Sequence, residues 1–310
     1  MRDEIINFVM NWSSKLELPV NRILGWIAIS PNRFYDWKRR YNKPNEHNHN
    51  LPKSHWLLQQ EIEAITVYAK EHPYEGYRLL TYMMLDKNIV AVSASSVYRV
   101  LTQAGLLNER NTKTSKKGTG FIQPTRPHEH WHNDISYINI ACTFYYLISI
   151  LDGYSRYIVH WELRESMTEN DIEIVIQRAL EKFPGANPRI ISDNGPQYIS
   201  KDFKLYVRQM EMTHVKTSPY YPQSNGKLER YHRTIKTESV RRSNLSDINV
   251  AREILDDYVK FYNSERLHSA IGYIAPLNKL IGKEQAIFAE RRQKLRCATD
   301  RRKQSIKNTE

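Results

Sequence analysis

The chain has 310 residues and a net charge of +12, and hydrophobic residues make up 40% of it. This length is typical of two or three domains with well-formed cores, and the excess of positive charge favours a polyanionic partner, most often nucleic acid. No apolar run approaches the ~20 residues of a membrane-spanning helix, and the first residues lack the apolar region of a secretory signal.

Residues 1–45 predict a first helical unit. Apolar side chains follow a helical period up to Ile27, and Ser30-Pro31 then starts a new helix, because serine is a preferred N-cap and proline fits the first helical turn. Two short helices joined by a tight turn, the second one basic, are the plan of a helix-turn-helix. The candidate DNA-contacting side chains are Arg33, Lys38, Arg39 and Arg40. A plain helical hairpin with a solvated charged face is the alternative.

Residues 54–107 predict a second helical unit, separated from the first by a polar stretch with two prolines. The expected helices run from Ser54 to Glu71, from Gly76 to Lys87 and from Ser93 to Leu106. This is a second candidate helix-turn-helix, with a purely structural bundle as the alternative. The following segment, 108–128, carries five basic residues against one acid and predicts a basic linker.

From residue 129 the pattern changes to strands. Residues 144–152 and 157–163 are nearly continuous apolar runs on either side of DGYSR, and they predict a hairpin of buried strands. With one strand before them and two after, the order β-β-β-α-β-α-β-α predicts a mixed five-stranded sheet flanked by helices over 129–282. The remaining residues, 283–310, hold nine basic and four acidic residues and predict a solvated helix or a disordered tail.

Three carboxylates stand out by position: Asp134 on the first strand, Asp193 at the end of the fourth, and Glu229 at the start of the helix after SNGK. Sites in α/β folds form at such strand ends and helix starts. Carboxylates are ligands that Mg²⁺ prefers, and two ions about 4 Å apart promote in-line displacement at phosphorus. Arg233 and Lys236 share a helix face with Glu229 and would hold DNA there. Ordinary surface pairing of Glu229 with Arg233 is the alternative.

Four blocks occur in order along this region: WHNDISYI, YLISILDGYSRYIVHWEL, IISDNGPQYIS and PQSNGKLERYHRTIKTE. They resemble the catalytic core that retroviral-type integrases share with the DDE transposases of bacterial insertion sequences. YVKFYNSERLHSAIGYIAP resembles the C-terminal block of that family, and the helical region before the core resembles the helix-turn-helix of bacterial transposases. Because Cys142 and Cys297 are the only cysteines, the zinc domain of retroviral integrases is absent, which favours the bacterial subgroup.

The resemblance implies an α/β ribonuclease H-like core behind an all-α DNA-binding region, and it implies a DNA transposase. Asp134, Asp193 and Glu229 are then expected to bind two Mg²⁺ or Mn²⁺ ions. The implied reaction is hydrolysis at the end of the element, followed by attack of the freed 3′-OH on target DNA. The core side chains expected to contact DNA are Arg233, Lys236, Asn194, Asn225 and Lys227.

The expected partners are double-stranded DNA, at the terminal inverted repeats and at the target, and further copies of the chain, because two DNA ends must be joined in one event. A bacterial cytoplasmic location near the nucleoid is expected. Two alternatives come from other classes: a DNA-binding regulator with an inactive core, which would not need the three acids, and a structure-selective nuclease, which would cut without joining. A basic structural protein is the third.

Overall fold

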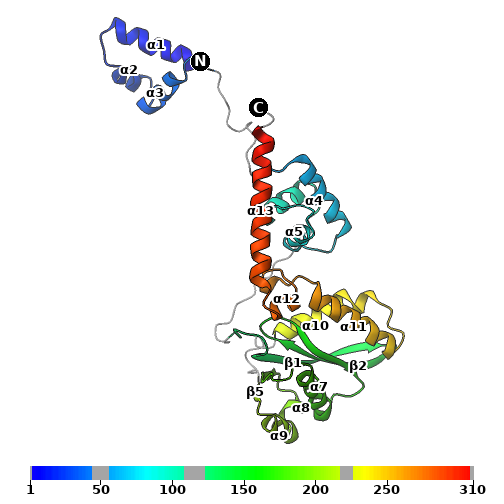
Figure 1. The fold of residues 1–310 in the computed structure, drawn as a ribbon. Coiled ribbons are helices and arrows are strands. Elements are labelled where there is room, and N and C mark those ends of the chain that lie inside the picture. The colour runs from blue at the N-terminus through cyan, green and yellow to red at the C-terminus, as the bar shows by residue number, and fades with distance from the viewer. Residues whose placement is uncertain (1, 44–55, 108–122, 217–225, 308–310) are drawn as a thin grey trace. The chain divides into compact units, whose positions relative to one another are not determined.

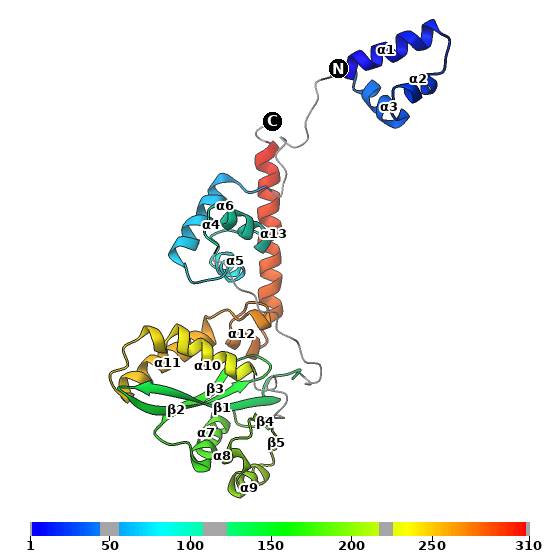
Figure 2. The same ribbon diagram turned by 180° about the vertical axis from the view of Figure 1, so that it is seen from behind.

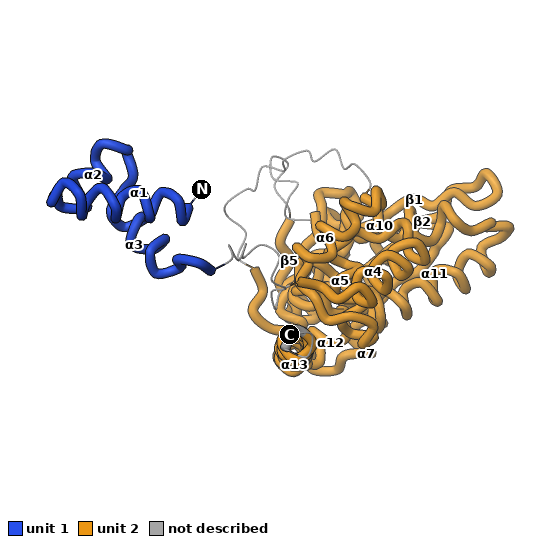
Figure 3. The backbone as a smooth tube through the Cα atoms, turned by 90° about the horizontal axis from the view of Figure 1, so that it is seen from above, with its two compact units in different colours: residues 1–53 blue, residues 54–310 orange. Residues whose placement is uncertain are grey.

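The computed structural model describes residues 2–43, 56–107, 123–216 and 226–307 (Figure 1). The chain divides into two compact units, residues 1–53 and residues 54–310 (Figure 3). Among the described helices, none combines the length and the apolar character that crossing a membrane requires.

The first unit is a small bundle of three helices. They are α1 (Arg2–Lys15), α2 (Val20–Trp26) and α3 (Pro31–Arg39). Its core consists of Ile6, Val9, Ile23, Leu24 and Phe34. The backbone of Ser30 is extended and Pro31 occupies the first helical turn of α3, so the predicted helix start is confirmed.

The second unit begins with another three-helix bundle. Its helices are α4 (Gln59–Glu71), α5 (Tyr77–Asp86) and α6 (Ala94–Gln103). Ser93 caps α6, because its hydroxyl accepts the N–H of Ser96. The three predicted helices are confirmed, although the first begins at Gln59, and Ser54 lies outside the described residues. This bundle has an apolar core of its own, with Ile65, Leu80, Met84, Val97 and Leu101 among its members.

A five-stranded sheet with the order β3-β2-β1-β4-β5 forms the centre of the region that follows. The strands are β1 (His130–Ile140), β2 (Thr143–Asp152), β3 (Ile158–Arg164), β4 (Arg189–Ser192) and β5 (Thr213–Lys216). The first three strands pair antiparallel, whereas β4 runs parallel to both β1 and β5. The predicted mixed sheet of a ribonuclease H-like core is therefore confirmed.

Helices cover both faces of this sheet (Figure 2). One face carries α7 (Glu169–Lys182), α8 (Pro196–Ile199) and α9 (Lys201–Gln209), and the other carries α10 (Gly226–Glu238) and α11 (Ile248–Ser264). Strand β2 faces both layers, with Leu147 and Leu151 in one apolar cluster and Ile148 and Ile150 in the other. A strand buried on both faces has no polar side to show, which explains its continuous apolar run.

The edge strand β3 is tied to α11 through side chains. Asn263 accepts a hydrogen bond from the N–H of Ile158 at 2.8 Å and donates one to its carbonyl at 3.0 Å. At the other end of the strand, Arg252 donates to the carbonyl of Leu163 at 3.0 Å. These bonds hold α11 in a fixed register on the sheet.

A short helix, η2 (Val240–Arg242), joins α10 to α11, and η3 (Ser269–Ile271), α12 (Pro276–Leu280) and α13 (Glu284–Lys307) follow α11. The sequence predicted a solvated helix or a disordered tail for 283–310, and that prediction is wrong for one face of α13. Arg291 binds Asp86 of α5, and Arg302 binds Glu61 of α4, so two of the basic residues are buried. Counting charges does not reveal this packing, because the acidic partners lie more than 200 positions earlier in the chain.

Candidate active site

Asp134 lies on β1, the middle strand of the sheet. It comes just after the segment of β1 that pairs with β4, so it lies near the end of β4. One carboxylate oxygen accepts the backbone N–H of Ile135 at 3.0 Å, and the other lies 3.5 Å from Nδ1 of His232 on α10. The side chain is only 15% exposed, so its charge is felt strongly by its neighbours.

Asp193 directly follows β4, and the parallel pairing of β4 with β1 brings it to the same end of the sheet as Asp134. Its Oδ1 accepts the N–H of Gly195 at 3.0 Å. The chain beyond it is held against β1, because the buried hydroxyl of Tyr198 donates to Asn133 at 3.0 Å. This bond fixes the loop after Asp193 to the residue that precedes Asp134.

Glu229 lies on the exposed side of α10. The opposite side of the helix is buried, with Leu228, Tyr231 and Ile235 in the cluster that also holds side chains of β1 and α11. Apolar residues at this spacing fix the rotation of a helix about its axis. The carboxylate of Glu229 is therefore turned away from the core.

The far end of α10 is held by an ion pair. Arg266 donates to both oxygens of Glu238 at 2.7 and 2.8 Å, and the hydroxyl of Tyr258 donates to the same carboxylate at 2.7 Å. Two-point binding of a carboxylate by a guanidinium fixes orientation as well as distance. The C-terminal block that resembles the family thus positions the helix that carries Glu229.

Asp134 interacts electrostatically with each of the other two acids. Burial raises the pKa of Asp193, and the charge of Asp134 raises it further, against a hydrogen bond from Gly195. Burial also raises the pKa of Glu229, again with a contribution from Asp134 that His232 partly offsets. In the part of the chain that the structure describes, neither Asp193 nor Glu229 forms an ion pair. Their carboxylates are therefore available to a ligand from outside the chain.

This oxygen-donor set suits a hard divalent cation, because such ions prefer carboxylate ligands and relieve repulsion between them. Within the described ranges, no three His, Cys, Asp or Glu side chains lie close enough together to enclose a metal ion. Asp134 thus lies within electrostatic reach of both Asp193 and Glu229, but the three side chains do not form a closed cage.

Basic residues on α10 lie beside the acids. His232, three positions after Glu229, is buried against Asp134, and our sequence analysis did not select it. The signal was available, because residues three apart share a helix face. Burial and Arg241 lower the pKa of Lys236, while the charge of Asp134 opposes them, so Lys236 lies near the acids. Arg233 is exposed on the same helix.

The remaining predicted DNA contacts of the core differ in their surroundings. Lys227 donates to the carbonyl of Gly153 at 3.0 Å, and burial followed by the charge of Arg156 lowers its pKa to about 7. Lys227 therefore helps to hold α10 to the turn between β2 and β3. Asn194 is exposed beside Asp193. Asn225 lies outside the described residues.

The candidate bases of the first unit are all exposed, three of them on α3 and Arg40 directly after it. Arg33 lies over the ring of Trp37 with 4.8 Å to its centroid. Arg39 and Arg40 both pair with Asp36, and Lys38 lies 3.5 Å from the sulfur of Met10. Their roles in DNA binding stay predictions.

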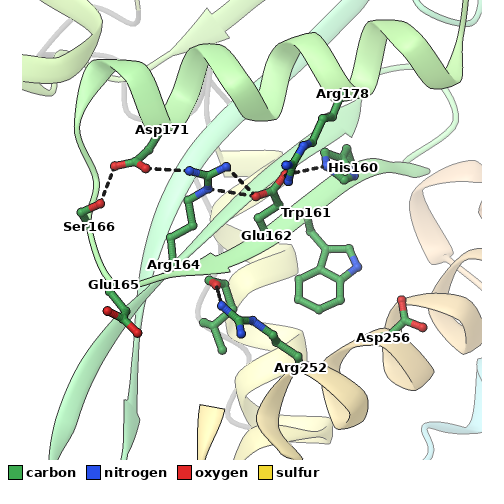
Figure 4. Close-up of a pocket in the computed structure, with 11 residues that line it drawn as sticks. His160, Trp161, Glu162, Arg164, Glu165, Ser166, Asp171, Arg178, Arg252 and Asp256 are labelled. Carbon is green, nitrogen blue, oxygen red and sulfur yellow. Dashed lines mark hydrogen bonds and ion pairs between the residues drawn. The ribbon is translucent and has the colours of Figure 1, made fainter. Parts of the chain in front are cut away.

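A second group of acids lines a cavity of about 630 Å³ between β3, α7 and α11 (Figure 4). Arg164 lies between Glu162 and Asp171 and donates to both, at 2.9 and 2.7 Å. Arg178 and His160 also form hydrogen bonds with Glu162, and the hydroxyl of Ser166 donates one to Asp171.

Burial raises the pKa of Glu162, but hydrogen bonds from His160, Arg178 and Arg164 outweigh it and bring the pKa to about 2. The pKa of Asp171 also falls to about 2, because bonds from Ser166, Thr168 and Arg164 outweigh the effect of burial. Since these acids already have their partners, this cavity is a structural network and not the candidate active site.

Comparison with known proteins gives one family. The sequence profile described as "Integrase core domain" matches residues 124–222, and a second profile with the same description matches residues 210–276. The transposase for insertion sequence element IS629 of Shigella sonnei is 22% identical over 83% of this chain and 90% of its own length. A protein of insertion element IS136 from Agrobacterium fabrum is 31% identical over 42% of this chain and 70% of its own length.

Solved structures were also compared. The simian T-cell lymphotropic virus intasome, in complex with a PP2A regulatory subunit, has a TM-score of 0.47 at 17% identity and covers 70% of this chain and 74% of its own. The HTLV-2 integrase catalytic core domain, in complex with magnesium, has a TM-score of 0.42 at 15% identity and covers 50% of this chain and 98% of its own.

Proposed function

Because this chain belongs to the integrase core domain family and is a DNA transposase of the insertion-sequence type, we propose that Asp134, Asp193 and Glu229 are its catalytic residues. One observation carries this assignment. The charge of Asp134 raises the pKa of both other acids, although the three side chains come from β1, the end of β4 and α10. A stable fold does not require acids that oppose one another's ionisation in this way, whereas a cation site does.

These three carboxylates would hold divalent ions, two Mg²⁺ or Mn²⁺ in our proposal, which activate the attacking oxygen and stabilise the leaving one when bound. The chain supplies the positioning. Tyr198 holds the loop of Asp193 on β1, and His232 lies against Asp134 and orients its carboxylate. Arg233 and Lys236, beside the acids on α10, would bind the phosphates of the DNA end.

The proposed reaction is hydrolysis of a phosphodiester at the end of the element, followed by in-line attack of the freed 3′-OH on target DNA. No covalent bond to the enzyme forms. Because two ends are joined to one target, we propose that copies of the chain assemble on DNA. The site of action would be DNA in the bacterial cytoplasm.

The two helical units are proposed to bind the terminal inverted repeats. In the first unit the exposed bases of α3 would contact DNA, with Arg33, Lys38, Arg39 and Arg40 as candidates. In the second, α6 is the last helix of the α5–turn–α6 arrangement, and its exposed face carries Tyr98, Arg99 and Thr102. A polar face on the second helix of such a pair is what reads a major groove.

The test is strand cleavage and strand joining on a duplex with the element end, in the presence of Mg²⁺, by wild type and by Asp193→Asn. We expect both activities in wild type and neither in the variant. Glu162→Gln is the matched control, because its acid belongs to the same core but has its charge already paired. Equal activity of wild type and Asp193→Asn would refute the site. Cutting without joining by wild type would indicate a nuclease, and binding without cutting an inactive regulator.

A further inference from the structure

Arg291 of α13 is buried, 5% exposed, and binds two other parts of the second unit at once. Its guanidinium donates to both oxygens of Asp86 on α5, at 2.7 and 2.6 Å. It also donates to the carbonyls of Gly272 and Tyr273, at 3.1 and 2.7 Å. Four hydrogen bonds satisfy most of the five donors of this side chain, so its position is closely determined.

The loop that offers the two carbonyls is shaped for this contact. Gly272 and Tyr273 both have left-handed backbone conformations, with φ of +82° and +55°. A Cβ atom at Gly272 would lie 2.6 Å from the ring of Phe288 on α13, so only glycine fits there. The N–H of Tyr273 and the N–H of His268 are bonded within the loop, which keeps both carbonyls turned toward Arg291.

Aromatic rings complete the contact. Tyr82 of α5 stacks on Tyr273, with ring centroids 4.7 Å apart and planes 18° from parallel. The guanidinium of Arg291 lies over the ring of Tyr82 with 4.7 Å to its centroid. The helical bundle, the loop after α11 and the C-terminal helix therefore meet at one residue.

The apolar cores on either side of this contact do not merge. The cluster of the α4–α6 bundle contains no residue of the sheet, and the cluster beneath α10 and α11 contains no residue of the bundle. Each part thus has its own hydrophobic stabilisation. Their mutual orientation rests on directional polar and aromatic contacts, of which those of Arg291 are the most buried.

Arg302, on the same helix, provides a comparison. It is equally buried, at 6% exposed, and it also forms a two-point ion pair, with Glu61 of α4. Its remaining bond goes to the carbonyl of Ala91, which also belongs to the bundle. Arg302 attaches α13 to the bundle alone, whereas Arg291 also binds the loop after α11.

We propose that Arg291 is the positioning residue that fixes the α4–α6 bundle on the catalytic core, and so sets the distance from the bound DNA sequence to the bond that is cut. This rests on the proposed function, in which the bundle binds the element end and the core cuts it. The residue itself touches neither DNA nor the reacting atoms. It acts by holding the core at one orientation relative to the recognition helix.

The test uses full-length Arg291→Gln with Arg302→Gln as the matched control. We expect Arg291→Gln to bind the element end with unchanged affinity and an unchanged footprint. Its cleavage is expected to spread over several neighbouring positions, with a fall of about 100-fold at the correct bond, because misplaced reacting groups lose rate steeply. Arg302→Gln should cut at the wild-type position.

A second measurement needs no DNA. Spin labels at Lys70 on α4 and Glu181 on α7, in a chain with Cys142 and Cys297 changed to serine, report the distance between bundle and core. All four positions are exposed. We expect a broadened distance distribution for Arg291→Gln and a narrow one for Arg302→Gln. If Arg291→Gln does not fold, Asp86→Asn removes the same link from the side of the bundle and should give the same two results.

The outcomes separate this inference from the proposed function. A wild-type cutting position and a narrow distance distribution in Arg291→Gln and Asp86→Asn would overturn the role of Arg291 and leave the three acids untouched. Loss of end binding through the bundle is expected from changes on the exposed face of α6, such as Arg99→Gln, and not from Arg291→Gln or Asp86→Asn. If that variant binds the element end normally, the proposed role of the bundle fails, whatever Arg291 does.

Discussion

The catalytic core holds two groups of carboxylates that behave in opposite ways. Glu162 and Asp171, at β3 and α7, are surrounded by donors, and both have a pKa of about 2. Asp193 and Glu229, near Asp134, have pKa values raised by burial and by the charge of Asp134. The acids that stabilise the fold are thus paired within the chain, whereas the acids that we propose serve the reaction have no ion pair among the described residues except that of Asp134 with His232.

The largest effect should come from removing a charge of the unmatched group. Asp134→Asn, Asp193→Asn or Glu229→Gln is expected to lower strand cleavage by about 1,000-fold or more, because each removes a proposed ligand of the catalytic ions. The melting temperature in metal-free buffer should not fall for Asp193→Asn or Glu229→Gln, since each change removes repulsion with Asp134. If these variants instead melt at a clearly lower temperature than wild type, the replaced acids stabilise the fold, as Glu162 and Asp171 do.

The paired acids, Glu162 and Asp171, should show the opposite response, with lower stability and nearly unchanged activity. Glu162→Gln leaves three cationic or polar donors without their carboxylate, so we expect a loss of about 2–3 kcal/mol in the free energy of unfolding. Cleavage at a permissive temperature should stay close to wild type. Chemical denaturation measures the first quantity. Glu165→Gln, an exposed neighbour, should change stability by less than about 0.5 kcal/mol.

Acid titration sharpens the comparison. The pKa of Glu162 in the folded chain, about 2, lies below its ordinary value of 4.5. The stability it contributes is therefore fully present above pH 4.5 and is lost as the pH falls toward 2. We expect the difference in stability between wild type and Glu162→Gln to shrink over this range. A difference that is constant from pH 6 to pH 3 would contradict the assigned pKa.

The smallest effect should be the stabilisation by divalent ions. At ten times its Kd, Mg²⁺ should add about 1.4 kcal/mol to the free energy of unfolding, if it binds only the folded chain. Asp193→Asn should abolish this gain, and Glu162→Gln should keep it. Thermal melting with increasing Mg²⁺ gives both results, and an equal gain in the Asp193 variant would mean that the ions bind elsewhere.

Much of the fold was predictable from the sequence, because local patterns determine it. The hairpin of β2 and β3, the start of α7 at Thr168 and the start of α3 at Pro31 all follow from periodicity and capping. Asp134 and Asp193 were also placed correctly on or after their strands. What local patterns cannot supply is the pairing of distant charges.

The errors and omissions of the sequence-based prediction arise because local patterns do not reveal contacts between charges on different elements. Arg291 and Arg302 were counted among the bases of a solvated tail, yet each is buried against an acid that lies more than 200 residues away. Glu162 was not selected, because Arg178 comes from the next helix, although its other two partners, His160 and Arg164, lie two positions away on the same strand. His232 was missed although it shares a face with Glu229, since only the structure brings Asp134 to that face.

The bonds from α11 to β3 also have a consequence for how copies of the chain meet. An outer strand with free N–H and C=O groups invites another strand to add to it, which leads to aggregation. Asn263 already occupies both backbone groups of Ile158, and Arg252 occupies the carbonyl of Leu163. Strand addition is thereby disfavoured at both ends of β3, so the copies of the chain that we propose assemble on DNA avoid joining sheet to sheet at this edge.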